Sequence, residues 1–269
     1  MKFAPIIYLI GMLLCILSLF MLVPAFVDWF YGSENWPAFV GSSISTLFVG
    51  LILFFSNKGS ATEHLELRQA FLLTNSAWIS IALFGSLPFL LSNIEMSFID
   101  AFFESTSGIT TTGATVIENL EAKSHGILIW RALLQWLGGV GIIVMALAVL
   151  PMLSIGGMQL FKTESYETPD KVVPKAASFA AGISIVYITL TVIWALMLWG
   201  AGMPMFDSIA HAMTTLATGG YSTKSESLAA FNSSTIEIII IFGMLVGSLP
   251  FVHYLTLSKN GLKNLIKDD

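Results

Sequence analysis

The sequence predicts an all-α integral membrane protein, in which two N-terminal spans precede two repeats of a span, a short helix and a span. Composition is the first observation: 55% of the 269 residues are hydrophobic and only 11% are charged, whereas about a quarter of a soluble domain is charged. Mean hydropathy is +0.82. The second observation is a set of apolar stretches long enough to cross a bilayer. The third is a polar, Thr- and Gly-rich segment that occurs twice between such stretches.

The apolar stretches define six candidate spans of about 20 residues or more, the length that crosses the hydrocarbon core of a bilayer. They are Pro5–Val27, Pro37–Ser56, Gln69–Ser92, Ile127–Leu153, Ala177–Gly200 and Thr235–Leu257. No clear small-residue cleavage site follows the first stretch, so we expect it to remain as a transmembrane helix rather than to be removed as a signal peptide.

Two shorter, semi-polar segments lie between spans, and each precedes one of the polar loops. Ser97–Ile109 and Met205–Leu216 are too short to cross a bilayer and are expected to form re-entrant helices. A shift of 107 residues places Asp100 on Asp207 and Gly113 on Gly220, which indicates an internal repeat. The expected organisation has two N-terminal helices in 1–66 and a first repeat in 67–160. Residues 161–269 then hold a cytoplasmic connector, a second repeat and a short tail.

The distribution of lysine and arginine predicts a cytoplasmic N-terminus, because basic residues concentrate on the cytoplasmic side of membrane proteins. With alternating spans, nine basic residues fall on that side: Lys2, Lys58, Arg68, Lys162, Lys171, Lys175, Lys259, Lys263 and Lys267. Three fall outside: Lys123, Arg131 and Lys224. Both polar loops then open to the outside.

The polar loops, Ile109–Thr115 and Leu216–Ser222, have the composition of a cation site. Glycine permits backbone angles that turn successive carbonyls the same way, and carbonyl oxygens replace the water of a dehydrated cation. The C-terminal end of a preceding helix adds partial negative charge. A plain outer turn is the alternative for one loop alone, but a matched pair favours two strands of a selectivity filter.

Four strings of residues resemble the TrkH/KtrB potassium-uptake superfamily, and TrkH most closely. The similarity runs from the first span to about Pro250 and corresponds to the N-terminal part of that family. The strings are Asp100-Ala-Phe-Phe-Glu-Ser-Thr-Ser-Gly-Ile-Thr-Thr-Thr-Gly-Ala-Thr115, Gln135-Trp-Leu-Gly-Gly-Val-Gly-Ile-Ile143, Leu150-Pro-Met-Leu-Ser-Ile-Gly-Gly-Met-Gln159, and Phe206-Asp-Ser-Ile-Ala-His211 with Gly219-Gly-Tyr-Ser222.

The resemblance implies span–pore helix–span repeats with re-entrant filter loops, four per pore, of which this chain supplies two. It implies potassium uptake across the bacterial cytoplasmic (inner) membrane by a multi-pass protein, with potassium as substrate and no organic cofactor. Glycine at 113, rather than serine, resembles the potassium-selective members. The implied filter residues are Thr111, Thr112, Gly113, Thr218, Gly219 and Gly220. The implied potassium-contacting carbonyls are those of Thr111, Thr112, Thr218 and Gly219.

Two strands do not encircle an ion, so the resemblance also implies partners. The remaining strands come from a missing C-terminal half or from a second copy in a homodimer, and the family pattern favours truncation. A TrkA/KtrA-like nucleotide-binding regulatory subunit is implied on the cytoplasmic face. Membrane lipid surrounds the spans, and no nucleic-acid motif is present.

Ionisable residues in the short helices have two interpretations each. Asp100 and Asp207 are expected to cap their helices or to attract cations to an outer vestibule. Glu104 and His211 share a repeat position and are expected either to anchor the pore helix or to act at the site. Gly138 and Gly139 indicate close helix packing, with a hinge as the alternative.

Three further functions were weighed from the residues. A sodium-permeable member of the same superfamily is the first alternative, and a non-conducting, half-length subunit is the second. An enzyme is not expected, because no nucleophile–base pair or metal set is recognisable in the sequence. The single cysteine, Cys15, excludes a disulfide within the chain.

Overall fold

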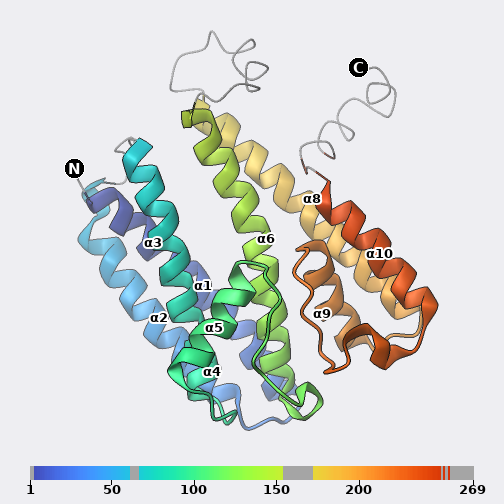
Figure 1. Cartoon of the computed structure of the whole chain (residues 1–269). Coiled ribbons are helices and arrows are strands. Elements are labelled where there is room, and N and C mark those ends of the chain that lie inside the picture. The colour runs from blue at the N-terminus through green and yellow to red at the C-terminus, as the bar shows by residue number, and fades with distance from the viewer. Residues whose placement is uncertain (1–2, 61–66, 154–171, 250, 252–253, 255–269) are drawn as a thin grey trace, which may run out of the picture.

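The computed structural model describes residues 3–60, 67–153, 172–249, 251 and 254, and its described part is helical without strands, which confirms the predicted fold class (Figure 1). The α-helices are α1 (Ala4–Phe30), α2 (Trp36–Ser56), α3 (Leu67–Gly85), α4 (Leu87–Leu91), α5 (Phe98–Ile109), α6 (His125–Leu153), α8 (Val172–Gly200), α9 (Met205–Leu216) and α10 (Ser234–Ser248). Short 3-10 helices are η1 (Lys58–Ser60), η2 (Leu120–Ala122) and η4 (Ser227–Phe231).

Long apolar helices show that the chain is a multi-pass membrane protein. Within the described residues, four stretches are long and apolar enough to cross a bilayer: Ala4–Phe30, Trp36–Ser56, Arg68–Leu91 and Ala181–Gly200. Helix α6 has 29 residues, which span about 43 Å at a rise of 1.5 Å per residue. Helix α10 covers 15 residues of the sixth predicted span, and most of that span after 249 lies outside the described residues, as does nearly all of the predicted connector.

The third predicted span, Gln69–Ser92, is not one continuous helix. Helix α3 ends at Gly85 and α4 begins at Leu87. The cause is Pro88, which lacks an N–H donor and whose ring clashes with the carbonyl four residues earlier. The break places the Gly85 carbonyl where the indole N–H of Trp130 donates to it at 3.0 Å.

The two short helices, α5 and α9, have 12 residues each and lie among the long helices in the half of the molecule away from the N-terminus (Figure 1). Helix α5 is capped by Ser97, whose Oγ accepts from the Asp100 N–H at 3.2 Å. The Ser97 hydroxyl donates to the Asp100 carboxylate at 2.7 Å. Helix α9 follows Pro204, with Asp207 in its first turn. An acidic residue thus lies at the start of each, where a carboxylate favours the helix dipole.

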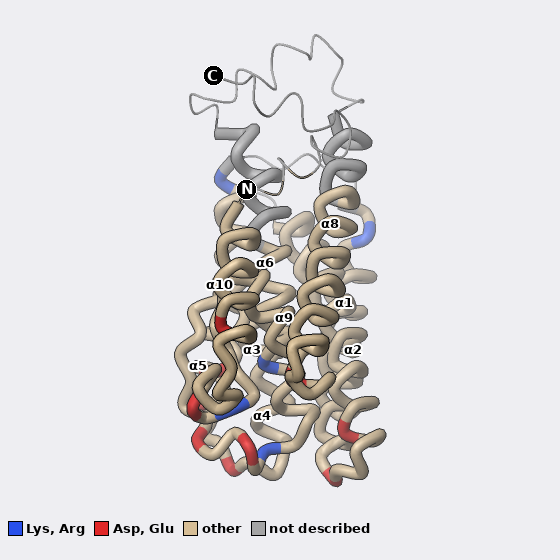
Figure 2. The backbone as a smooth tube through the Cα atoms, turned by 90° about the vertical axis from the view of Figure 1, so that its right-hand side faces the viewer, with Lys and Arg blue, Asp and Glu red and all other residues tan. Residues whose placement is uncertain are grey.

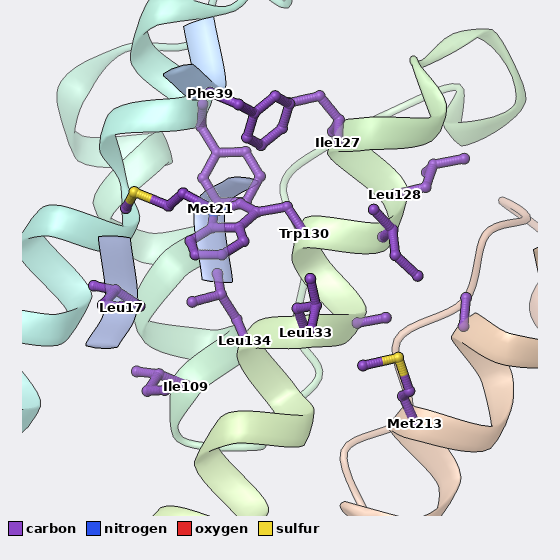
Figure 3. Close-up of a cluster of buried hydrophobic side chains, with 14 of the residues drawn as sticks. Leu17, Met21, Phe39, Ile109, Ile127, Leu128, Trp130, Leu133, Leu134 and Met213 are labelled. Carbon is purple, nitrogen blue, oxygen red and sulfur yellow. The ribbon is translucent and has the colours of Figure 1, made fainter. Parts of the chain in front are cut away.

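A buried apolar cluster joins the N-terminal helices to α6, and α5 and α9 pack against it. Figure 3 shows Trp130 and Leu134 of α6 beside Phe39 and Met21, with Ile109 near the same helix. The opposite faces of the long helices carry exposed apolar side chains such as Phe48, at 66% exposure. An apolar exterior suits lipid rather than water.

Charged residues gather at one end of the bundle. Figure 2 shows acidic residues in the loops at the end far from the N-terminus, where α4 and the start of α5 lie. Apart from these loops, the spans carry few charges in the described residues. The polar loops after α5 and α9 therefore lie in the half of the molecule that carries the acidic loops.

Candidate functional site

Both short helices end in the same hydrogen-bonded cap. After α5, the Thr111 N–H donates to the Gly108 carbonyl at 3.0 Å and the Thr112 N–H donates to the Ser107 carbonyl at 2.9 Å. These two bonds form a Schellman motif. The second loop has both bonds at positions 107 residues later: Thr218 to Thr215 at 3.0 Å and Gly219 to Thr214 at 2.9 Å. The cap turns each chain sharply out of its helix into the polar loop.

The backbone angles of the two loops also match. Thr111 has φ of 56° and Thr218 has φ of 53°, while Gly113 has 82° and Gly220 has 83°. A left-handed conformation is natural for glycine but costs about 1–2 kcal/mol for other residues. A threonine in this conformation persists only where the surroundings enforce it. The same unusual conformation is therefore built twice, once after each short helix.

The two loops meet at the glycines. A Cβ added to Gly113 would collide with the carbonyl oxygen of Gly219 and lie 3.2 Å from its carbonyl carbon. Gly219 is buried, whereas Thr112, Thr218 and Gly220 are exposed. Segments more than 100 residues apart in sequence thus touch through their backbones, and the threonines and Gly220 leave one side open.

Helix α6 supports the ends of both short helices. A Cβ on Gly138 would collide with the carbonyl of Ile109, the last residue of α5. A Cβ on Gly139 would lie 3.2 Å from Ala217, which caps α9, and 2.7 Å from the Tyr187 hydroxyl. Adjacent glycines therefore let one helix contact both helix ends at backbone distance, which is the packing role rather than the hinge.

Glu104 and Arg131 form a buried ion pair behind the first loop. Their side chains are 0% and 1% exposed, and the Arg131 Nε lies 2.7 Å from the Glu104 carboxylate. The carboxylate also accepts from the Thr115 hydroxyl at 2.9 Å and the Val116 N–H at 3.0 Å. A second Arg131 N–H donates to the Ser222 carbonyl at 2.8 Å. One ion pair thus anchors the residues that follow both loops.

Tyr221 crosses from the second loop to the first. Its hydroxyl lies 3.0 Å from the Glu104 carbonyl and 3.1 Å from the Ala114 carbonyl. The Arg131 guanidinium stacks 4.1 Å from the centre of its ring, a cation–π contact. The Tyr221 N–H donates to the Gln135 carboxamide at 3.1 Å. These contacts fix the distance between the two loops.

His211 occupies in α9 the repeat position of Glu104. Its Nδ1 lies 2.8 Å from the Asp207 carbonyl, which can only accept, so Nδ1 carries a proton. Its Nε2 lies 2.9 Å from the Ser222 hydroxyl. The Asp207 carboxylate accepts from the Thr223 hydroxyl at 2.6 Å. Asp207 and His211 therefore contact the end of the second loop, whereas Asp100 contacts only the start of its own helix among the printed hydrogen bonds of the described residues.

A clamp joins the two chain segments beyond the loops. The Glu121 carboxylate accepts from the Ser225 N–H at 2.8 Å and from its hydroxyl at 2.6 Å. The Ser225 Oγ in turn accepts from the Leu120 N–H at 3.1 Å. The hydrogen bonds from Ser225 lower the pKa of Glu121 below its ordinary value of 4.5.

The structure brings most of the predicted site residues together: the two loops touch, and Glu104 and His211 lie behind them, while Asp100 lies apart at the start of α5. Sequence reasoning missed three residues, Arg131, Gln135 and Tyr221. Arg131 had been counted as an outer basic residue, but it is buried and paired. A polar side chain within an apolar span was the available signal, because such residues are seldom there without a role.

Comparisons with known proteins agree with this geometry. Residues 36–267 match the family model of TrkH, a cation transport protein. The Trk system potassium uptake protein TrkH of Salmonella typhimurium is 39% identical over 272 residues, covering 100% of this chain and 56% of that protein. The Trk system potassium uptake protein TrkI of Halomonas elongata is 37% identical, covering 99% and 54%.

A solved structure is also similar. The crystal structure of the potassium transporter TrkH from Vibrio parahaemolyticus matches with a TM-score of 0.87 at 38% identity, covering 97% of this chain and 53% of that one. The chain therefore spans about half the length of the relatives it matches. Their names describe transporters rather than enzymes. On the family match and these relatives, the chain belongs to the TrkH family of cation transport proteins.

Proposed function

We propose that this chain takes part in potassium uptake across the bacterial cytoplasmic membrane and supplies two of four strands of a carbonyl-lined selectivity filter. The observation that carries the proposal is the contact of two equally capped loops at Gly113 and Gly219. Relatives named as potassium uptake proteins support potassium as the substrate.

The geometry explains how such a filter would work. Carbonyls of Thr111, Thr112, Thr218 and Gly219 would replace the water around a potassium ion. The C-terminal ends of α5 and α9 point their partial negative charge toward these loops. The Glu104–Arg131 pair is internally neutral and holds the loops without adding a fixed charge of its own.

The open side of the loops supports the proposal that further strands complete the pore. They would come from a C-terminal half or from a second copy in a homodimer. We place the repeats in 67–160 and 161–269, after two N-terminal helices in 1–66. A cytoplasmic N-terminus, a TrkA/KtrA-like nucleotide-binding regulatory subunit on the cytoplasmic face, and lipid around the spans complete the proposal.

Growth of a potassium-uptake-deficient bacterial strain carrying the intact gene tests the proposal. We expect growth at low potassium and rubidium uptake into the cells. Gly113→Val is expected to abolish both, because a side chain there meets the Gly219 carbonyl and the left-handed φ disfavours a β-branched residue. Gly32→Ala is a matched control, since Gly32 also has a positive φ, of 70°, but no atom within 4 Å of the added Cβ. Rescue that survives Gly113→Val would sink the filter assignment.

The coverage of about half of each relative favours a second candidate, a half-length subunit that does not conduct. This candidate predicts no rubidium flux into liposomes containing this chain alone, together with stable association with a full-length transporter. The flux ratio of rubidium to sodium in the same assay separates a potassium-selective protein from a sodium-permeable one.

A further inference from the structure

Gln135 of α6 lies behind the meeting point of the two loops. Its side chain is 0% exposed. Its Oε1 accepts from the N–H of Tyr221 at 3.1 Å, and Tyr221 directly follows the second filter glycine, Gly220. A side chain of the first repeat therefore supplies a hydrogen bond to the backbone of the second loop.

The carboxamide of Gln135 also explains why residue 219 is glycine. Gly113 and Gly220 have positive φ, but Gly219 is absent from the positive-φ residues of the described chain, so its backbone conformation does not demand glycine. A Cβ on Gly219 would instead collide with the Gln135 carboxamide and lie 2.7 Å from its Nε2. Gln135 thus fills the space that a side chain at position 219 would occupy.

The same carboxamide reaches the first loop. Its Nε2 lies 3.7 Å from the position of a Cβ on Gly113. In the described part of the chain this buried nitrogen has no hydrogen-bond partner. Buried donors without partners are rare in native structures, because an unmade hydrogen bond costs stability. A donor retained there, against both loops at their closest approach, indicates a role beyond packing.

We propose that Gln135 is a specificity-determining positioning residue that sets the spacing of the two filter strands. This inference rests on the proposed function. Discrimination between potassium and sodium depends on how many carbonyls surround the ion and how firmly they are held. Gln135 holds the Gly219–Tyr221 backbone against Gly113 and so controls the distance between the carbonyls of the two strands.

The second repeat lacks an equivalent device. The residue 107 positions after Gln135 is Phe242 of α10, whose side chain is 58% exposed and points away from the buried interior. The positioning therefore acts in one direction, from the helix of the first repeat to the strand of the second. Phe242 provides a matched control position.

The test compares Gln135→Met with Phe242→Met in the intact gene, with rubidium and sodium uptake measured in the uptake-deficient strain. Methionine keeps the length of glutamine but removes the carboxamide. We expect Gln135→Met to accumulate in the membrane and to lower the rubidium-to-sodium ratio about fivefold to tenfold, the effect of losing one buried hydrogen bond. Phe242→Met should leave the ratio unchanged. An unchanged ratio in Gln135→Met, or its failure to accumulate, would overturn the proposal.

A double variant tests the packing directly. Gly219→Ala should abolish rubidium uptake, because its Cβ meets Gln135. Adding Gln135→Ala removes the obstruction, so the double variant should recover part of the uptake with reduced selectivity. A double variant as inactive as Gly219→Ala would contradict the inference. If the unmodified gene fails to support growth at low potassium, the proposed function itself fails, and that result is separate from either variant.

Discussion

The loops after α5 and α9 share one hydrogen-bond pattern but are anchored by different chemistry. In the first, the carboxylate of Glu104 accepts from the hydroxyl of Thr115, 11 residues later. In the second, the imidazole of His211 contacts the hydroxyl of Ser222, also 11 residues later. The repeat therefore preserves where the pore helix holds its loop, while the chemical group that does so has changed.

The two anchors also differ in reach. Among the described residues, the Glu104 anchor continues through Arg131 to the Ser222 carbonyl, so it serves both loops. The His211 anchor closes on Asp207 within its own helix. The difference teaches that the repeats are not independent units: damage behind the first loop should reach the second, and damage behind the second should stay local.

Loss of Arg131 should have the largest effect. Arg131→Met leaves the Glu104 carboxylate buried without its cation, which costs about 3–5 kcal/mol, and leaves the Ser222 carbonyl without its donor. We expect a large fall in thermal stability in detergent and loss of rubidium uptake.

Two comparisons accompany Arg131→Met. Adding Glu104→Gln removes the uncompensated charge and should restore a substantial part of the stability. Lys224→Met, at a half-buried cation of the outer loops, should change stability little. Equal damage from Arg131→Met and Lys224→Met would show that the buried pair does not couple the loops.

The filter glycines should differ in their tolerance of alanine. Both have positive φ, so each substitution costs about 1–2 kcal/mol in backbone strain. Gly113→Ala adds a collision with the Gly219 carbonyl, whereas a Cβ on Gly220 has nothing within 4 Å among the described residues. Rubidium uptake should therefore fall far more in Gly113→Ala than in Gly220→Ala. Equal losses would mean that further strands crowd Gly220 as well.

Removal of the second anchor should have a moderate, local effect. Ser222→Ala deletes the hydroxyl partner of His211, which costs about 1 kcal/mol for a typical hydrogen bond. Its backbone carbonyl still accepts from Arg131, so the first loop should be undisturbed. A small fall in melting temperature with retained uptake is the expected result, and a fall as large as that of Arg131→Met would contradict the distinction between the anchors.

The outer clamp should give the smallest effect, and only in acid. The pKa of Glu121 is lowered in the folded protein, so the unfolded chain binds this proton more readily and stability rises with pH across the interval between the two pKa values. The contribution is complete above the ordinary pKa of 4.5 and is lost as the pH falls through the folded value. Ser225→Ala should flatten the acid limb of a melting-temperature profile and leave neutral pH nearly unchanged. An identical acid limb would exclude the clamp.

Much of the fold follows from composition and periodicity. Apolar length alone predicted the spans, and α5 and α9 end at the predicted residues, Ile109 and Leu216, because polar Thr- and Gly-rich sequence follows each. The break before α4 could have been read from Pro88, but one apolar run concealed it. Local signals were sufficient wherever one segment determines its own structure.

The contacts between segments were not predictable in the same way. Arg131 and Gln135 lie in an apolar span, and the sequence marks them as unusual without naming their partners. Their partners, Ser222 and Tyr221, lie in the other repeat. Which residues meet depends on how α6 packs between the two short helices, and one sequence holds no periodic signal for that.

The bond between Arg131 and Ser222 joins residues 91 positions apart, which has a consequence for how the protein is made. A ribosome adds about 5–20 residues per second, so the acceptor emerges roughly 5–18 s after the arginine. During that interval, the first pore helix is in place while the donors of Arg131 and Gln135 that belong to the second loop have no acceptor. The first repeat must wait in the insertion machinery, or partly hydrated, until the second repeat arrives to complete it.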